Sequence, residues 1–257
     1  MDSLTNVITL KAIDVAGLAL NIALYVAVGY IFYAVIPLSF GGVRFWPSVI
    51  VPAIFAVVFG PLVGGVGAAT GIFISDAIFG NNLLLSLIAG VTSNFVAFYL
   101  LGYIAKKKIK WTTPVVAYGI LTVLFMWIGY AYTELDMLTK VAFICVTLAS
   151  YIIFLIPVVL LKNSKWRSFQ VGAVSGMLLG AAIIAITVPP FLAAFLNGPA
   201  VTVPLALSTF FFTFFTEVPF VLILGPPIIA AIYRAFPTLK NRRAITVPGP
   251  PNSSEKS

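Results

Sequence analysis

Residues 59–80, FGPLVGGVGAATGIFISDAIFG, combine an apolar character suited to a membrane with many small residues and one carboxylate. On a helix of 3.6 residues per turn, the small residues gather on one side and the bulky residues lie opposite. Membrane helices associate through close packing of such small residues, because lipid tails are as apolar as leucine. We therefore predict a transmembrane helix over 62–80 that packs tightly against its neighbours. Asp76 projects at the edge of the packing side and should face protein.

The composition of the whole chain indicates an integral membrane protein. Of the 257 residues, 61% are hydrophobic and 9% are charged, whereas soluble domains carry about 25% charged residues. The apolar runs fit helices of roughly 20 residues and exceed the 9–11 or so residues of a barrel strand. We predict an all-α, polytopic helical bundle in the cell membrane. The net charge of +8 comes from basic residues between apolar segments, which set topology and do not suggest nucleic acid.

The order of apolar segments and basic clusters predicts the topology. Eight apolar segments lie at about 12–37, 47–60, 62–80, 83–105, 113–133, 139–161, 170–196 and 204–234. With eight spans, the basic clusters that follow the fourth, sixth and eighth segments share one side, which the positive-inside rule places in the cytoplasm with both termini. A variant with six spans, in which 47–60 and 62–80 form a re-entrant hairpin, gives the same sidedness. We assign 1–236 to the bundle and the polar, proline- and serine-containing 237–257 to a disordered cytoplasmic tail.

Few polar side chains fall inside the predicted spans. Intramembrane carboxylates are costly and are candidate functional sites. Glu217 lies in the middle of the last segment, and Asp76 lies near the outer end of the third. Asn94 lies near the middle of the fourth. The alternatives are a structural hydrogen bond for Glu217, cheap solvation near the interface for Asp76, and an interhelical hydrogen bond for Asn94.

Aromatic residues gather near the predicted outer surface. Trp46 lies beside Arg44 in a short loop shaped by Pro37, Gly41, Gly42 and Pro47, and Trp127 lies towards the outer end of the fifth segment. These rings form either an interfacial belt or an aromatic-lined pocket for a planar organic solute. Trp46 is the best candidate for the pocket, because its loop is short and shaped.

The chain lacks the residues that several classes of function require. The chain has no histidine and few acidic residues, so we expect no metal site, no acid–base pair and no enzymatic activity. No nucleotide-binding motif of the GxxxxGK[ST] type occurs, so we expect no cofactor.

Two further stripes of small residues follow helical spacing. In the first segment the stripe consists of Ala12, Ala16, Ala19, Ala23, Ala27 and Ala34, with Tyr30 as its one bulky member. This alanine stripe serves either packing within the bundle or docking of another membrane protein. In the seventh segment the stripe consists of Gly172, Gly176 and Gly180, for which we expect internal packing.

The stretches VRFWPSVIVPAIFAVVFGPLVGGVGAATGIFISD (43–76) and SLIAGVTSNFVAFYLLGYIAKK (86–107) resemble the substrate-binding S component of energy-coupling factor (ECF) transporters. That family has an inward N-terminus, an outside loop after the first helix, a short second helix, and an Asp that ends the third helix. The last segment, FFTEVPFVLILGPPIIAAIYRAF (214–236), resembles the family's final helix more weakly. S components usually have six helices, so two of the eight predicted segments have no counterpart and 108–200 remains unassigned.

The resemblance implies a subunit that binds a small vitamin-like solute from outside and works with a membrane T component and two ABC-type ATPases. In the family an Ala-x-x-x-Ala stripe on the first helix contacts the T component, and Ala19, Ala23 and Ala27 match it. The loop that caps the pocket corresponds to Arg44 and Trp46. Asp76, Asn94, Trp127 and Glu217 complete the predicted substrate-binding set. The alternative is a self-contained secondary transporter that uses Glu217 and Asp76 as proton or sodium sites.

Overall fold

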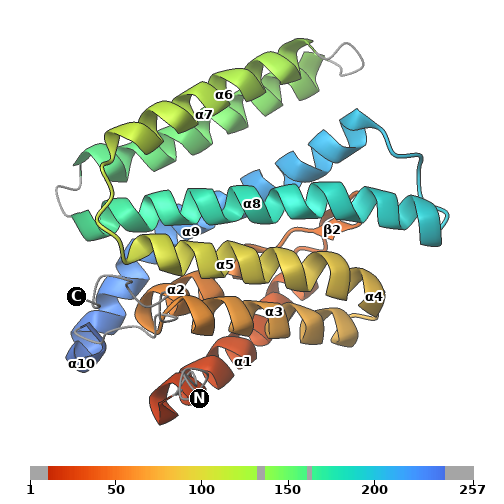
Figure 1. Ribbon diagram of the computed structural model, residues 1–257. Helices are drawn as coiled ribbons and strands as arrows, with labels where there is room; N and C mark the ends of the chain where they lie inside the picture. Colours follow the sequence, from red (N-terminus) through yellow and green to blue (C-terminus); the bar gives the residue numbers. More distant parts are fainter. Residues whose placement is uncertain (1–10, 132–136, 161–163, 241–257) are drawn as a thin grey trace, which may run out of the picture.

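The computed structural model describes residues 11–131, 137–160 and 164–240. Within these ranges the protein is a bundle of helices with one small β-hairpin (Figure 1). The long helices are α1 (Ala12–Val35), α3 (Pro61–Ile78), α5 (Thr92–Ala105), α6 (Thr112–Ala131), α7 (Met137–Leu160), α8 (Ser164–Phe195) and α9 (Val203–Ala235). The short elements are β1 (Ser39–Phe40), β2 (Val43–Arg44), η1 (Pro47–Val49), α2 (Ile50–Val58), α4 (Leu83–Leu85), η2 (Ser86–Val91) and α10 (Pro237–Lys240).

All eight predicted segments contain a helix, and the described residues contain 7 helices that are long and apolar enough to cross a membrane. The second predicted segment is the one whose helix is too short to count among these, because its apolar helix covers only Pro47–Val58. At about 1.5 Å per residue this helix reaches roughly 18 Å, against a hydrocarbon core of about 30 Å. The prediction of an all-α polytopic membrane protein is confirmed at this level. Of the predicted tail, Pro237–Lys240 forms the short helix α10, and 241–257 lies outside the described residues.

The helices run between two opposite ends of the bundle (Figure 1). At one end, which we call the basic end, α1, α6 and α8 begin and α5, α7 and α9 finish. The described basic residues of this end include Lys106, Lys107, Arg167 and Arg234. The opposite end, which we call the hairpin end, holds the β1–β2 hairpin and the connections that follow α3 and α8.

The small side of α3 meets three other helices, as predicted. A Cβ atom added to Gly71 would lie 2.7 Å from the Tyr25 ring of α1. One added to Gly65 would lie 3.0 Å from the carbonyl oxygen of Phe95 in α5, and Gly64 faces Ala56 of α2 in the same way. Glycine therefore allows α1, α2 and α5 to approach α3 closely. The tight connection before α3 depends on Gly60, whose φ of 118° few other residues adopt, followed by Pro61 at the first helical position.

The glycine stripe of α8 packs inside the bundle, as expected. A Cβ atom on Gly172 would lie 2.8 Å from the carbonyl oxygen of Leu101, and Gly176 abuts the carbonyl oxygen of Ala97. Both carbonyl groups belong to α5, so the stripe sets the distance between α5 and α8.

Substitution of Gly176 by alanine is expected to lower the free energy of unfolding by about 1–3 kcal/mol, because the added methyl group forces α8 away from α5. Thermal unfolding of the purified protein in detergent measures the effect. Gly90→Ala is the matched control, since a Cβ atom there would meet its nearest neighbour at an ordinary 3.4 Å. Equal melting temperatures for the two variants would contradict the prediction.

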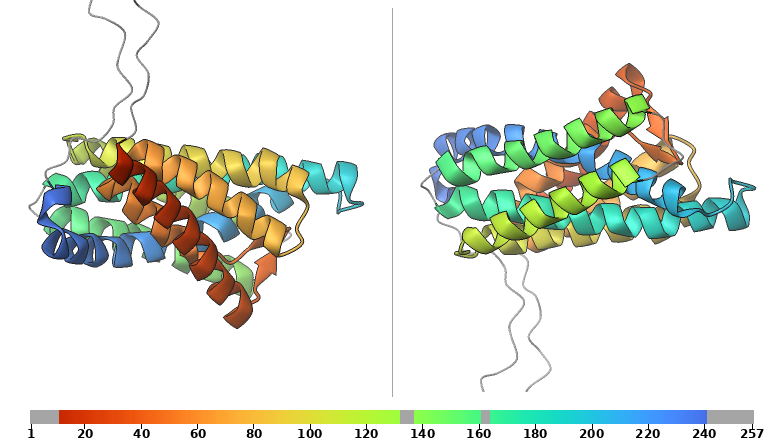
Figure 2. Two further views of the ribbon diagram at one scale, coloured as in Figure 1. Left: turned by 90° about the horizontal axis from the view of Figure 1, so that it is seen from below. Right: turned by 90° about the horizontal axis from the view of Figure 1, so that it is seen from above.

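Helix α1 lies obliquely across one face of the bundle and presents two opposite sides (Figure 2). The side that faces the bundle carries Asp14, Gly17, Asn21, Tyr25 and Gly29, all buried. The alanine stripe lies about 180° away around the helix and is exposed. Packing of this stripe within the bundle, one of the two interpretations of the sequence, is therefore wrong for the isolated chain.

Helices α6 and α7 form a pair on the side of α8 and α9 that is away from α1 (Figures 1 and 2). The pair contacts α9 through aromatic rings, including Phe143 against Phe211 with ring centroids 4.0 Å apart. Without this pair, α1, α2, α3, the continuous helix formed by α4, η2 and α5, α8 and α9 make up a six-helix unit. The helical residues that line the cavity of the candidate site lie in this unit or in η1, which leads into α2.

Candidate functional site

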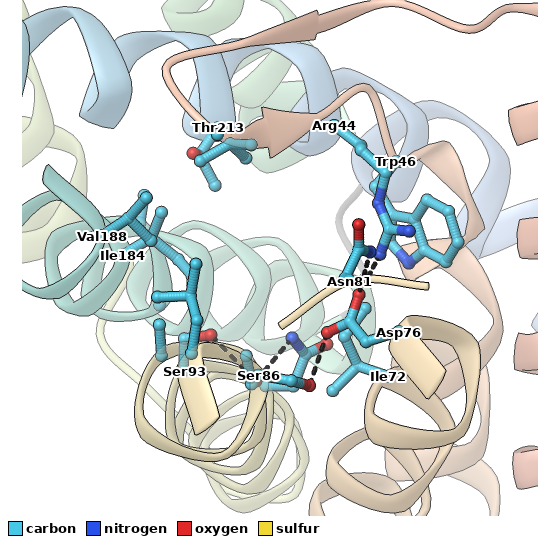
Figure 3. Close-up of a pocket in the computed structure, with 18 of the residues that line it drawn as sticks. Arg44, Trp46, Ile72, Asp76, Asn81, Ser86, Ser93, Ile184, Val188 and Thr213 are labelled. Carbon is cyan, nitrogen blue, oxygen red and sulfur yellow. Dashed lines mark hydrogen bonds and ion pairs between the residues drawn. The ribbon is translucent and has the colours of Figure 1, made fainter. Parts of the chain in front are cut away.

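A cavity of about 300 Å³ lies within the six-helix unit and reaches from the hairpin end towards the middle of the bundle. Its wall combines residues from β2, α1, α3, η2, α5, α8 and α9. Figure 3 shows polar groups on one side of the space, around Asp76, and apolar side chains such as Ile184 and Val188 of α8 on another. This volume lies at the lower end of the range of small-molecule sites, which is about 300–1,000 Å³.

Asp76 is the centre of the polar network at the hairpin end (Figure 3). Its Oδ1 atom accepts hydrogen bonds from Arg44 Nη2 and, at 2.8 Å, from Asn81 Nδ2. Its other oxygen, Oδ2, accepts a hydrogen bond from the hydroxyl group of Ser86. The carboxylate is therefore hydrogen-bonded on both oxygens and paired with a cation. These interactions offset the free-energy penalty of removing it from water.

The β1–β2 hairpin brings Arg44 to this network. Gly41 and Gly42 both have positive φ, of 56° and 81°, as a tight two-residue hairpin turn requires. The turn pairs Ser39 with Arg44, so the chain folds back over the cavity at this point.

Aromatic rings surround the guanidinium group of Arg44. Its Cζ atom lies 4.6 Å from the Trp46 ring centroid, 5.0 Å from that of Phe79 and 5.8 Å from that of Tyr33. Such contacts stabilise a cation at a desolvated site. The Nη1 atom is buried and has no hydrogen-bond partner among the described residues. Arg44 is thus held by Asp76 and by the rings, and its positive charge is compensated within the protein.

A second polar pair lies deeper in the cavity. The hydroxyl group of Tyr25 donates a 2.7 Å hydrogen bond to Asn94 Oδ1, and Asn94 Nδ2 donates one of 2.9 Å to the carbonyl oxygen of Gly90. Tyr25 is fully buried and reaches the cavity from α1. Asn94 is therefore the interhelical hydrogen bonder that the sequence offered as one alternative, and it also lines the cavity.

Glu217 lines the cavity from α9, one helical turn beyond Thr213. Its exposed fraction is 8%, and it has no hydrogen bond or ion pair within the described ranges. The alternative of a structural hydrogen bond inside the protein therefore finds no partner there. An unpartnered carboxylate at the wall of a cavity is a group available to a ligand.

The structure brings five of the six predicted substrate-binding residues to one cavity: Arg44, Trp46, Asp76, Asn94 and Glu217. Trp127 does not join them. It lies on α6, outside the six-helix unit, and is 64% exposed. The sequence indicates how far along the membrane-spanning segment Trp127 lies, but it does not indicate which helices pack beside it.

Tyr25, Asn81 and Ser86 also line the cavity, although the sequence pattern does not single them out as site residues. Tyr25 could have been found, since it projects opposite the alanine stripe of the same helix. Ser86 could not, because it begins the π-helical turn η2, where the ideal helical projection no longer holds. π-Helical turns occur frequently at functional sites, and this one directs Ser86 towards Asp76.

The arrangement can bind a compact solute through one free carboxylate, several amide and hydroxyl groups, and an apolar wall. The described residues contain no group of three or more acidic, cysteine or histidine side chains that could hold a metal ion. A scan against protein-family models, a search of curated proteins and a search of solved structures each found no match to this chain.

Proposed function

We propose that this protein is a substrate-binding subunit of the ECF S-component type, which takes up a small vitamin-like organic solute together with a T component and two ABC-type ATPases. The observation that carries the proposal is the cavity of about 300 Å³ beneath the β1–β2 hairpin. Its residues Arg44, Trp46 and Asp76 belong to the stretch that resembles the family. In this proposal the loop after the first helix caps the binding site, as the resemblance implies.

The exposed alanine stripe supports a partner in the membrane. Ala19, Ala23 and Ala27 project away from the six-helix unit on α1. Small side chains allow another helix to approach closely, and no other described part of the chain covers this face. We assign this surface to the T component.

The six-helix unit also supports the proposal. S components usually have six helices, and α6–α7 accounts for the two segments without a counterpart. In this proposal α6–α7 is an addition that packs against α8 and α9 on the side away from α1.

The basic end is proposed to face the cytoplasm and the hairpin end to face outward across the cell membrane. Helices α2 and α3 together start and finish at the hairpin end, so they leave the sidedness of all other helices unchanged. The same sidedness holds whether α2 counts as an eighth span or as half of a re-entrant pair. Both termini are then cytoplasmic.

Calorimetry of the purified chain with a panel of vitamins tests the proposal. We expect one member of the panel to bind to the chain alone. We also expect affinity purification from native membranes to recover a T component and two ATPases. Absence of binding to every member, together with absence of these partners, would refute the proposal.

The unpartnered carboxylate of Glu217 favours a second candidate, a self-contained secondary transporter. Its other proposed ion site, Asp76, is occupied by Arg44 in this conformation, which weakens this alternative. Ion-coupled uptake by the purified chain alone in vesicles, without any ATPase, would establish it.

A further inference from the structure

Charge is distributed unevenly inside the cavity. Three charged side chains line it: Arg44, Asp76 and Glu217. Arg44 and Asp76 form an ion pair with each other, so their charges cancel at the hairpin end. Glu217 stands apart on α9 and has no cation beside it within the described ranges. The cavity therefore contains one carboxyl group, that of Glu217, which has no counterion among the described residues.

Burial makes this group costly without a partner. Glu217 is 8% exposed, and no described side chain or backbone N–H group donates a hydrogen bond to it. A carboxylate out of water requires a counterion or hydrogen-bond donors. A ligand that supplies both on the same group would satisfy Glu217 better than a neutral one.

The other walls limit the size and shape of such a ligand. A volume of about 300 Å³ suits a molecule of one or two rings and excludes a macrocycle. Phe98 and Tyr25 contribute rings, and Met177, Ile184 and Val188 contribute an apolar surface. A flat apolar body with a polar end fits this wall.

We propose that the solute is a compact organic cation whose N–H groups pair with the Glu217 carboxylate, such as an amidinium, a primary ammonium or a protonated amino-heteroaromatic ring. Its apolar body lies along α8, and its opposite end reaches the amide groups near Asp76 at the hairpin end. This inference rests on the proposed function and adds the charge class of the solute to it. Glu217 is the residue that determines specificity for charge.

The test compares matched cationic and neutral probes on the purified full chain in detergent. Benzamidine is paired with benzamide, and benzylamine with benzyl alcohol, so that charge changes while size is kept. The same assay includes cationic, neutral and anionic vitamins. Binding is followed by calorimetry and by the change in total tryptophan fluorescence, to which Trp46 in the cavity wall contributes together with the three other tryptophans of the chain.

The variant Glu217→Gln removes the charge and keeps the shape. Thr216→Val is the matched control, because Thr216 is the preceding residue on α9, bonds to the carbonyl oxygen of Phe212 and does not line the cavity. We expect cationic probes to bind the Glu217→Gln variant about 10- to 100-fold more weakly than the wild type, and to bind the Thr216→Val variant as tightly as the wild type. Neutral probes should bind equally to all three proteins.

Two results would overturn the inference while the proposed function stands. One is a vitamin that binds as an anion or a neutral molecule with unchanged affinity in Glu217→Gln. The other is a Glu217→Gln variant that melts like the wild type and still binds the cationic probes and vitamins fully. Binding of no organic solute, with stabilisation by sodium or potassium chloride that disappears in Glu217→Gln, would overturn this inference together with the proposed function and assign Glu217 to an inorganic ion.

Discussion

Replacement of Asp76 by alanine is expected to lower the free energy of unfolding by about 3 kcal/mol and to abolish solute binding. The substitution leaves the guanidinium group of Arg44 among three aromatic rings without its counterion. Removal of one partner from a buried pair costs about 3–5 kcal/mol. We take the lower end, because the Arg44 and Asp76 side chains keep 15% and 10% exposure. Binding is lost because the hairpin that caps the cavity loses its attachment to α3.

A double substitution separates the charge from the shape of the site. Arg44→Met combined with Asp76→Ala removes both charges, and we expect it to recover most of the stability lost in Asp76→Ala. Denaturant or thermal unfolding of the wild type, the two single variants and the double variant gives the coupling energy. A double variant as unstable as the sum of the two single variants would contradict an energetic role for this pair.

Replacement of Ala23 by tryptophan is expected to abolish assembly with the proposed T component and to leave binding of the proposed solute intact. Ala23 lies in the middle of the exposed alanine stripe, on the side of α1 away from the bundle. A bulky ring there prevents the close approach of a second helix. Co-purification from native membranes measures assembly, and calorimetry measures solute binding in parallel.

Leu24→Trp provides the matched control for this substitution. Leu24 is the next residue, is 40% exposed and points about 100° away from Ala23 around the helix. We expect assembly to survive Leu24→Trp, because the added ring faces lipid. Equal partner recovery with Ala23→Trp and Leu24→Trp would remove the alanine stripe from the docking surface.

The sequence predicts the helices and the close packing of α3 well, since both depend on local patterns. Small residues at helical spacing specify where neighbours can approach, and Gly71 and Gly65 meet α1 and α5 accordingly. The alanine stripe of α1 was harder to place, because small residues suit an internal contact and an external one equally. The buried polar residues Asp14 and Asn21 on the opposite side of α1 indicate which side faces the bundle.

The site was predicted as a set of residues but not as a set of contacts. Arg44 and Asp76 were both candidates, yet their pairing depends on the fold-back of the chain at Gly41 and Gly42. Ser86 joins them only because the helix widens at η2. Trp127 was also a candidate, but it stays outside the cavity. Its position along the predicted span places it near the outer surface, and that position does not reveal that α6 packs away from the cavity.

Helix α1 has a position that makes it a mechanical link. Its inner side places Tyr25 at the cavity, where the hydroxyl group holds Asn94, and its outer side carries the alanine stripe. Only the thickness of one helix, about 10 Å, separates these two surfaces. Any movement of α1 that accompanies occupation of the cavity therefore also changes the face offered to a partner. If occupation of the cavity changes the affinity for the proposed partner, thermodynamic reciprocity requires that the partner, once bound to the stripe, changes the affinity for the solute by the same factor.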